Sequence, residues 1–268
     1  MRSVIKLSSF MLDSNIWEQI IEPEDFVLNK KYDIYQEINK KLFPLNGNTV
    51  FLSSMIFDLE SIGRKDRIKE LQKYEPQIEI EVCHDQDSHT THFTFTIGPD
   101  HFPYKANPYL ERRFQKAFEA GVHVVRNTRV GIPPINHMCD SALISFTEKQ
   151  NSKMGEALDY IENELHAGFY AFNNILQNKK IKFSTNFLQI IRSIPPDSIN
   201  QFASAVAEWA DGDTLAIHIG MGFDYFVTDD KAKNAGTTSV FSQSNGTKLK
   251  NKYPLLRIIT PEEMLGLL

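Results

Sequence analysis

Residues 211–230, DGDTLAIHIGMGFDYFVTDD, carry a helix pattern that passes directly into a strand pattern. The first part, 211–222, predicts a helix with an acidic start, and 223–230 predicts an apolar strand that ends in acidic residues. Strands and helices that alternate along a chain favour an α/β fold with a mostly parallel sheet.

The alternation continues through much of the chain. Short apolar runs predict strands at residues 4–12, 49–52, 122–127, 142–146 and 255–259. Helical spacing of apolar residues, with capping signals or glycines at the ends, predicts helices at residues 32–43, 55–63, 107–120, 153–178, 198–209 and 260–268. The sequence therefore predicts an α/β fold with a mostly parallel central sheet.

One segment in the middle departs from this alternation. Residues 78–83 and 92–97 alternate between apolar and polar side chains with a period of two, and the polar segment 84–91 joins them. This pattern predicts a β-hairpin inserted into the main fold. Farther along, residues 231–252 are polar and basic and predict a flexible loop.

The composition is that of a globular protein of a reducing compartment. The 268 residues are 41% hydrophobic and include 19 Phe, which is enough to build a packed core. The two cysteines, Cys83 and Cys139, are far apart, so we expect no disulfide framework. No apolar run suits a signal peptide or a membrane span, so we expect a cytoplasmic protein without membrane contact.

Charge and motif content exclude several classes of function. A net charge of −5 at pH 7 excludes a strongly basic coat that binds nucleic acid regardless of sequence, although one local basic groove remains compatible with it. The chain has no Walker loop, no GxGxxG motif and no GxSxG motif. Nucleotide-dependent enzymes and serine hydrolases are therefore disfavoured.

Four acidic residues occupy equivalent positions in the predicted fold. They are Asp13 at the end of the first strand, Glu60 in the helix after the second, Asp211 at a helix start and Asp230 at the end of the next strand. The C-terminal ends of parallel strands and the starts of the following helices share one edge of a sheet, so these carboxylates should converge. Gathered carboxylates repel one another unless a cation lies among them, and their oxygens suit Mg²⁺ or Mn²⁺.

Segments at both ends of the chain resemble the motifs of the PIN-domain family, in the family's order. MLDSNIW (11–17) is similar to the opening strand and Asp, and FLSSMIFDLESIG (51–63) to the second motif. Residues 211–230 are similar to the third and fourth motifs, and LLRIITPEEML (255–265) to the last strand and helix. The resemblance implies a three-layer α/β/α PIN-like fold and a metal-dependent ribonuclease.

The resemblance also implies roles for single residues. The catalytic residues and metal ligands that it implies are Asp13, Glu60, Asp211 and Asp230, with Asp213 as a further metal ligand. Asn15 and Thr228 match the small polar residues that orient these ligands.

Two of the assignments have a rival nearby in the sequence. Asp58 rivals Glu60, but positions 58 and 60 are about 200° apart on a helix, so only one of them can face the site. Asp213 is a close second to Asp211 and could replace or assist it. Both alternatives stay open at this point.

The chemistry that the resemblance implies is RNA hydrolysis. Bound Mg²⁺ or Mn²⁺ lowers the pKa of a water molecule, which then attacks a phosphodiester. RNA would be attracted by the basic residues near the acids, namely Arg64, Lys65, Lys231 and Lys233. We therefore expect an endoribonuclease.

The domain organisation suggests two rival functions. We expect a PIN-like core in two parts, 1–62 and 198–268, and an insertion at 63–197 that holds the hairpin and a long helix. The insertion is larger than the family's usual connection. One rival, ranked below the nuclease, is a catalytically silent module that binds RNA, a partner protein or a second copy through 63–197. The other rival is the toxin of a toxin–antitoxin pair, because many compact PIN proteins act in that way.

Histidines provide one further metal candidate. His84, His89 and His92 lie within nine residues, which suits zinc, although a solvated loop is the more common explanation. His218 is expected to be a packed histidine and not a ligand.

Overall fold

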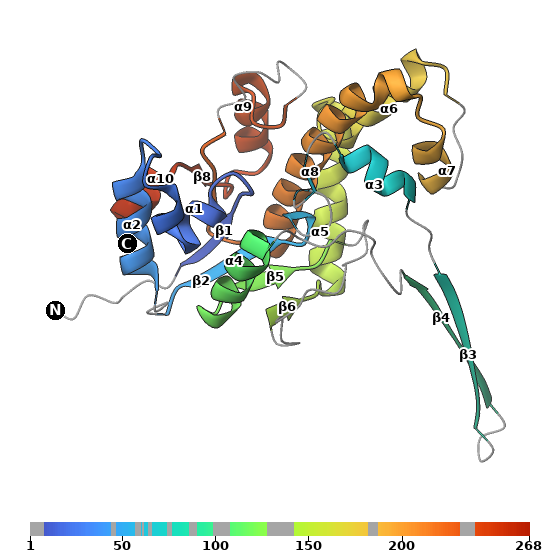
Figure 1. Cartoon of the computed structure of the whole chain (residues 1–268), viewed down its shortest axis with the longest axis horizontal. Coiled ribbons are helices and arrows are strands. Elements are labelled where there is room, and N and C mark those ends of the chain that lie inside the picture. The colour runs from blue at the N-terminus through green and yellow to red at the C-terminus, as the bar shows by residue number, and fades with distance from the viewer. Residues whose placement is uncertain are drawn as a thin grey trace.

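The computed structural model describes residues 8–43, 47–56, 60, 62–63, 66–73, 77–85, 90–98, 108–127, 142–181, 187–230 and 239–268. For residues 77–85, 90–98 and 187–188 it describes the backbone only. Within these ranges, six parallel strands form one sheet in the order β6-β5-β2-β1-β7-β8 (Figure 1).

The strands of this sheet come from widely separated parts of the chain. They are β1 Ser9–Leu12, β2 Thr49–Ser53, β5 His123–Val125, β6 Leu143–Ile144, β7 Tyr225–Val227 and β8 Ile258–Ile259. The central strand β1 pairs with β2 through Phe10 and Val50 and with β7 through Phe10 and Tyr225. The predicted parallel sheet is confirmed, and β5 and β6, from within the range 63–197, are part of it.

Helices cover both faces of the sheet. They are α1 Trp17–Ile21, α2 Tyr32–Leu42, α3 Arg67–Lys73, α4 Pro108–Glu119, α5 Glu148–Asp159, α6 Phe169–Asn178, α7 Phe187–Arg192, α8 Ile199–Met221, α9 Gln243–Lys252 and α10 Pro261–Leu267. Short 3₁₀ turns lie at Pro23–Phe26 and Pro196–Ser198, and a π-helical turn lies at Tyr160–Glu164. No helix in the described ranges is both long enough and apolar enough to cross a membrane.

Alternate residues of the strands point to opposite faces of the sheet and contribute to two separate hydrophobic cores. Phe10 and Leu12 of β1 face a core that they share with α1, α2, α4 and α10. Met11, between them in the sequence, faces a second core built with α5, α8 and α9. One sheet between two helical layers is a three-layer α/β/α fold, which is the layering that the resemblance implies.

A third core lies beside the sheet. Helices α3, α6 and α7 and the first half of α8 enclose a cluster of buried aromatic and aliphatic side chains, among them Phe172, Phe202 and Trp209. Figure 1 shows these helices gathered at one side of the sheet. We call this part the side lobe.

The predicted hairpin is confirmed. Strands β3 Gln77–Asp85 and β4 Thr90–Gly98 pair in antiparallel register, with Ile80 opposite Phe95. They form a two-stranded sheet separate from the central one. Figure 1 shows the hairpin extending away from the rest of the molecule.

The predicted helices 198–209 and 211–222 are wrong as separate elements, because α8 runs through both. Its interior contains Gly212, which costs up to about 1 kcal/mol relative to alanine in a helix. The glycine is needed for packing, because a Cβ at Gly212 would lie 2.8 Å from Cα of Gly168. Asp211 therefore lies in the middle of a helix and not at its start.

Two further sequence predictions are corrected. The expected helix 153–178 is divided into α5, the π-helical turn and α6, and the chain turns at His166 and Gly168 with φ of 54° and 63°. The expected loop 231–252 contains α9, whose N-cap residue Ser242 accepts a hydrogen bond from the backbone of Asn245. In the first case a turn with positive φ interrupts a segment whose apolar spacing is helical. In the second case an N-cap starts a helix in a segment of polar composition.

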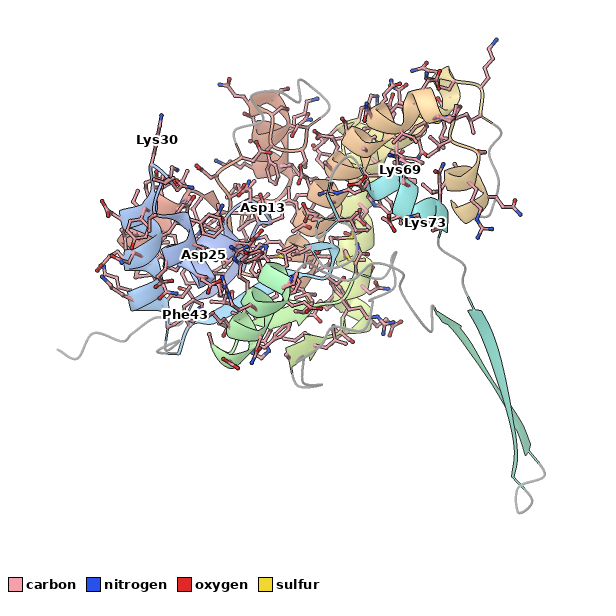
Figure 2. The ribbon with its side chains drawn as sticks, in the orientation of Figure 1. Asp13, Asp25, Lys30, Phe43, Lys69 and Lys73 are labelled. Carbon is pink, nitrogen blue, oxygen red and sulfur yellow. The ribbon has the colours of Figure 1, made fainter. Side chains whose placement is uncertain are left out.

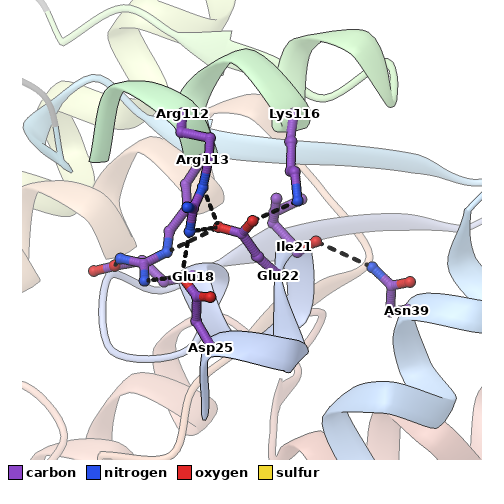
Figure 3. Close-up of polar contacts among 8 residues, drawn as sticks. All are labelled: Glu18, Ile21, Glu22, Asp25, Asn39, Arg112, Arg113 and Lys116. Carbon is purple, nitrogen blue, oxygen red and sulfur yellow. Dashed lines mark hydrogen bonds and ion pairs between the residues drawn. The ribbon is translucent and has the colours of Figure 1, made fainter. Parts of the chain in front are cut away.

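An ionic cluster joins α4 to α1 and the 3₁₀ turn that follows α1 (Figure 3). Its basic members are Arg112, Arg113 and Lys116, and its acidic members are Glu18, Glu22 and Asp25. The side chain of Glu22, only 5% exposed, contacts all three basic residues, with 2.7 Å to Arg112 Nη2. Buried charge paired in this way orients one helix on another.

We predict that Gly220→Ala destabilises the protein by about 1–3 kcal/mol, because a Cβ there would lie 2.7 Å from Cβ of Met154 on α5. Gly246→Ala on α9 is the matched control. A Cβ at that position meets nothing within 4 Å, so helix propensity should stabilise the protein by about 0.5–1 kcal/mol. Urea unfolding measures both free energies. Equal effects would contradict the close packing of α8 on α5.

We also predict that Glu22→Gln lowers the free energy of unfolding by roughly 2 kcal/mol, because it removes the buried carboxylate charge that pairs with Arg112, Arg113 and Lys116. The control Glu24→Gln, at an exposed neighbour, should change it by less than about 0.5 kcal/mol. Thermal unfolding of the two variants tests this. A Glu22→Gln variant as stable as the control would show that the cluster contributes nothing to stability.

Candidate functional site

Asp13 lies directly after β1 at the C-terminal edge of the sheet. It is 3% exposed, and Figure 2 shows it among packed side chains, whereas Lys30 projects from the surface. Thr228 Oγ1 donates to Asp13 Oδ2 at 2.5 Å, and Asn15 Nδ2 donates to the same oxygen at 3.0 Å. The backbone N–H of Ser14 donates to Oδ1 at 2.7 Å. These three donors fix the orientation of the carboxylate.

Thr228 connects Asp13 to the end of β7. Its hydroxyl oxygen accepts hydrogen bonds from Asn15 Nδ2 at 3.1 Å and from the backbone N–H of Asp230 at 3.0 Å. The structure thus brings Asn15 and Thr228 into contact with Asp13, where the family resemblance expects them. Asp230 lies two residues beyond, close enough to act on Asp13 electrostatically.

Asp229 and Asp230 are adjacent in sequence but have different surroundings. Asp229 forms an ion pair with Lys31 at 2.6 Å, and Lys31 also pairs with Glu262 on α10 at 2.7 Å. Asp230 is exposed and lies near the buried acids. Only one of the two neighbouring carboxylates is therefore directed to the candidate site.

Glu60 approaches Asp13 from the segment after β2. Arg67 on α3 fixes this segment, because its Nε donates to the carbonyl of Ile62 at 3.0 Å and its Nη2 to the carbonyl of Glu60 at 3.4 Å. A cavity of about 120 Å³ opens beside Glu60. Its lining residues are Ser14, Trp17, Glu18, Ile56, Glu60, Arg67, Leu110 and Phe114.

Helix α8 supplies Asp211 and separates it from Asp213. Residues two positions apart on a helix point about 200° apart, so the two carboxylates cannot share one environment. Asp211 interacts electrostatically with Asp13 and Glu60. Asp213 is buried and accepts a hydrogen bond from Asn127 Nδ2 at 2.9 Å. Asp211 is thus the α8 residue that joins the other acids.

Burial raises the pKa of three of these acids, and for Asp13 and Asp211 the charges of neighbouring carboxylates raise it further. Burial and the negative charge of Glu60 raise the pKa of Asp13 to about 7. Burial and the charges of Asp13 and Glu60 hold the pKa of Asp211 well above its usual value. Burial also raises the pKa of Glu60, although a hydrogen bond from Ser14 and the charge of Arg67 favour its ionised form. A cation near these carboxylates would relieve the repulsion.

The acids suit a divalent cation in chemistry and charge, but they do not yet surround a single point. Carboxylate oxygens are the preferred ligands of Mg²⁺ and Mn²⁺. Among the residues that the structure describes, no three His, Cys, Asp or Glu side chains form a group that could hold a metal ion. Binding would therefore require the carboxylates to adjust, or water to bridge them to the ion.

Several predicted residues lie outside the described ranges. They are Asp58 and the four basic residues expected to attract RNA: Arg64, Lys65, Lys231 and Lys233. His89 is also outside them, and only the backbone of His84 and His92 is described, so the zinc alternative remains a prediction.

The site also contains residues that the sequence did not reveal. Glu208 lies one helical turn before Asp211 and adds its negative charge there. Its spacing of three residues would have identified it if α8 had been predicted as continuous. Asn127 and Arg67 carry no such signal, because each acts through a contact with a segment distant in sequence or with backbone carbonyls.

Comparisons with protein-family models, curated proteins and solved structures found no match to this chain. What the chain does is therefore inferred from its own residues and from the motifs in its sequence.

Proposed function

We propose that this protein is a cytoplasmic, metal-dependent endoribonuclease that holds Mg²⁺ or Mn²⁺ with Asp13, Glu60, Asp211 and Asp230. One observation carries the proposal. Carboxylates from four separate parts of the chain lie near one another at the C-terminal edge of a parallel sheet, where burial and the charges of neighbouring acids raise the pKa of Asp13 and Asp211. Folds tolerate such repulsion chiefly at functional sites.

The surroundings of the acids support a role in binding a cation. Thr228 and Asn15 hold the Asp13 carboxylate in one orientation, as groups behind metal ligands do. Arg67 fixes the backbone of Glu60. Bound Mg²⁺ or Mn²⁺ supplies Lewis acidity for the attack of water on a phosphodiester. Asp211, on a buried helix, adds a carboxylate whose position is set by packing.

RNA as the substrate rests on the resemblance to the PIN-domain family. The resemblance extends over the first and last parts of the chain, and its motifs lie on β1, after β2, on α8 and after β7. Those are the elements that bring the four acids to one edge. The small cavity beside Glu60, with Arg67 in its wall, offers a place for a phosphate next to the acids.

We predict that in EDTA the protein loses stability as the pH rises from about 4 to about 7. Folded Asp13 keeps its proton up to about pH 7, whereas the unfolded chain releases it near pH 3.8, so the folded state is penalised across this interval. Mn²⁺ should restore the lost stability at about pH 7.5, because it binds the ionised carboxylates of the folded state. Thermal unfolding at several pH values measures both effects.

The variant Asp211→Asn tests the repulsion directly. In EDTA at about pH 7.5 it should unfold about 2–4 °C above the wild type, and Mn²⁺ should stabilise it less. The control Asp33→Asn, at an exposed acid of α2, should show neither change. A wild type insensitive to Mn²⁺ would argue against a metal site.

We predict that the protein cleaves labelled single-stranded RNA in Mn²⁺ or Mg²⁺ and not in EDTA. Asp13→Asn should reduce the cleavage rate at least about 100-fold, because it removes a charged ligand. Asp230→Asn and Asp229→Asn form a matched pair of neighbours. The first should be impaired, and the second should stay within about threefold of the wild type, because Asp229 faces Lys31 in a partly exposed ion pair.

The opposite outcome favours the silent binding module. If the wild type and Asp13→Asn were equally inactive on several RNAs in both metals, the nuclease proposal would fail.

A further inference from the structure

A second cavity lies at the other edge of the sheet, away from the acids. It has a volume of about 300 Å³, which is within the range of pockets for small ligands. It opens between α5, the C-terminal end of α8 and the segment that follows α9. Asp211 and His218 are seven residues apart on α8, so the two sites are separated by roughly 10 Å along the helix axis.

His218 is the polar group at the base of this cavity. It is 1% exposed, and neither ring nitrogen has a hydrogen-bond partner. The ring lies edge-on to Phe223 and Phe226, with centroids 6.1 and 5.6 Å apart. Burial lowers the pKa of His218 to about 3, against the charge of Asp224, so the imidazole is neutral near pH 7. A neutral imidazole offers one donor and one acceptor, and leaving them unpaired is costly.

The walls of the cavity are mostly apolar and aromatic. Its apolar lining residues include Phe223, Ile219 and Leu256. The ring of Phe223 is stacked on that of Phe51 of β2, with 4.0 Å between the ring centroids. The ring of Tyr253 lines it from the segment after α9 and is held edge-on by Tyr160. Rings fixed in this way suit a flat ligand.

Basic side chains outnumber acidic ones in the lining of the cavity. Lys153 on α5 and Lys252 on α9 line it, together with a single acid, Glu156. A further acid, Asp159, acts together with Glu156 on the Tyr253 hydroxyl. Both lysines are exposed. An anionic group on the ligand would meet two cations there. A metal ion fits less well, because the positive charges of Lys153 and Lys252 would repel it.

We propose that this cavity binds a nucleoside monophosphate, with the base against His218 and the phosphate between Lys153 and Lys252. A nucleobase is flat and carries hydrogen-bond donors and acceptors along its edge, which is what a neutral buried imidazole lacks. The phosphate complements the lysines at the mouth. A purely apolar ligand would leave the imidazole nitrogens unpaired, and a cationic ligand would meet the lysines.

The nucleotide could be free or the phosphorylated end of an RNA strand. Both sources present the same base and phosphate. The site is independent of the acids at the opposite edge, so its failure and the failure of the proposed nuclease can be distinguished. Binding in EDTA excludes any contribution from a metal at the acids.

The test is calorimetric titration of the full chain in EDTA with AMP, GMP, CMP and UMP, and separately with a short 5′-phosphorylated RNA. At least one mononucleotide should bind saturably, and adenosine or inorganic phosphate alone should bind at least about tenfold more weakly than AMP. Binding of the RNA but of no mononucleotide would overturn the proposal, whereas binding of both would identify the strand end as a second source.

Matched variants locate the site. Lys252→Glu should weaken mononucleotide binding at least about tenfold, whereas Lys250→Glu makes the same charge change on α9 away from the cavity and should alter it less than about twofold. Asp13→Asn should bind as the wild type does. Equal binding by Lys252→Glu and Lys250→Glu would overturn the proposal.

Nitrogen-15 NMR of the His218 imidazole provides a readout that does not depend on a core substitution. The ring nitrogens should shift on addition of the mononucleotide that binds in the titration. Unchanged His218 resonances at saturation would place the nucleotide elsewhere and overturn the assignment.

Discussion

The close packing of α8 is the constraint on which both halves of the molecule depend. This helix packs in the core that it shares with α5 and α9 and also in the side lobe. Between Trp209 and His218 every residue except Asp211 is buried. It can lie this close because Gly212 rests on Gly168 and Gly220 on Met154, where a methyl group would overlap its neighbour. The position of Asp211 is therefore set by the core and not by the acids around it.

The carboxylates at the C-terminal edge of the sheet repel one another, and the fold nevertheless holds them close together. Burying several carboxylates together raises the free energy of their ionised forms. Part of this cost is offset by hydrogen bonds from Thr228, Asn15 and the backbone of Ser14 to Asp13. The ionic cluster around Glu22 is different, because there the buried carboxylate has three basic partners. The presence of several acids does not distinguish the two clusters. The partners of those acids do, because they are basic side chains in one cluster and neutral donors in the other.

Sequence patterns predicted the elements whose signals are local. The strands alternate or are continuously apolar, and the capping box at Thr260 and Glu263 marks the start of α10. The shared edge of parallel strands predicted that Asp13 and Asp230 would lie near each other, and Thr228, two residues before Asp230, contacts Asp13. The continuity of α8 could not be predicted, since Gly212 looks like a helix break until Gly168 is known to face it. Asn127 and Arg67 act through contacts that no spacing along the chain encodes.

The pairing of β1 with β7 has a consequence for how the protein is made. Asp13 and Thr228 are 215 positions apart, and the sheet joins them only through this pairing. A ribosome releases residues in order, so β1 emerges long before its partner and must wait with one edge unpaired. The acids of α8 and the end of β7 reach Asp13 only after translation has passed residue 230. Until then the nascent chain carries β1 and β2 but no assembled acidic edge, so any activity that depends on it begins late in synthesis.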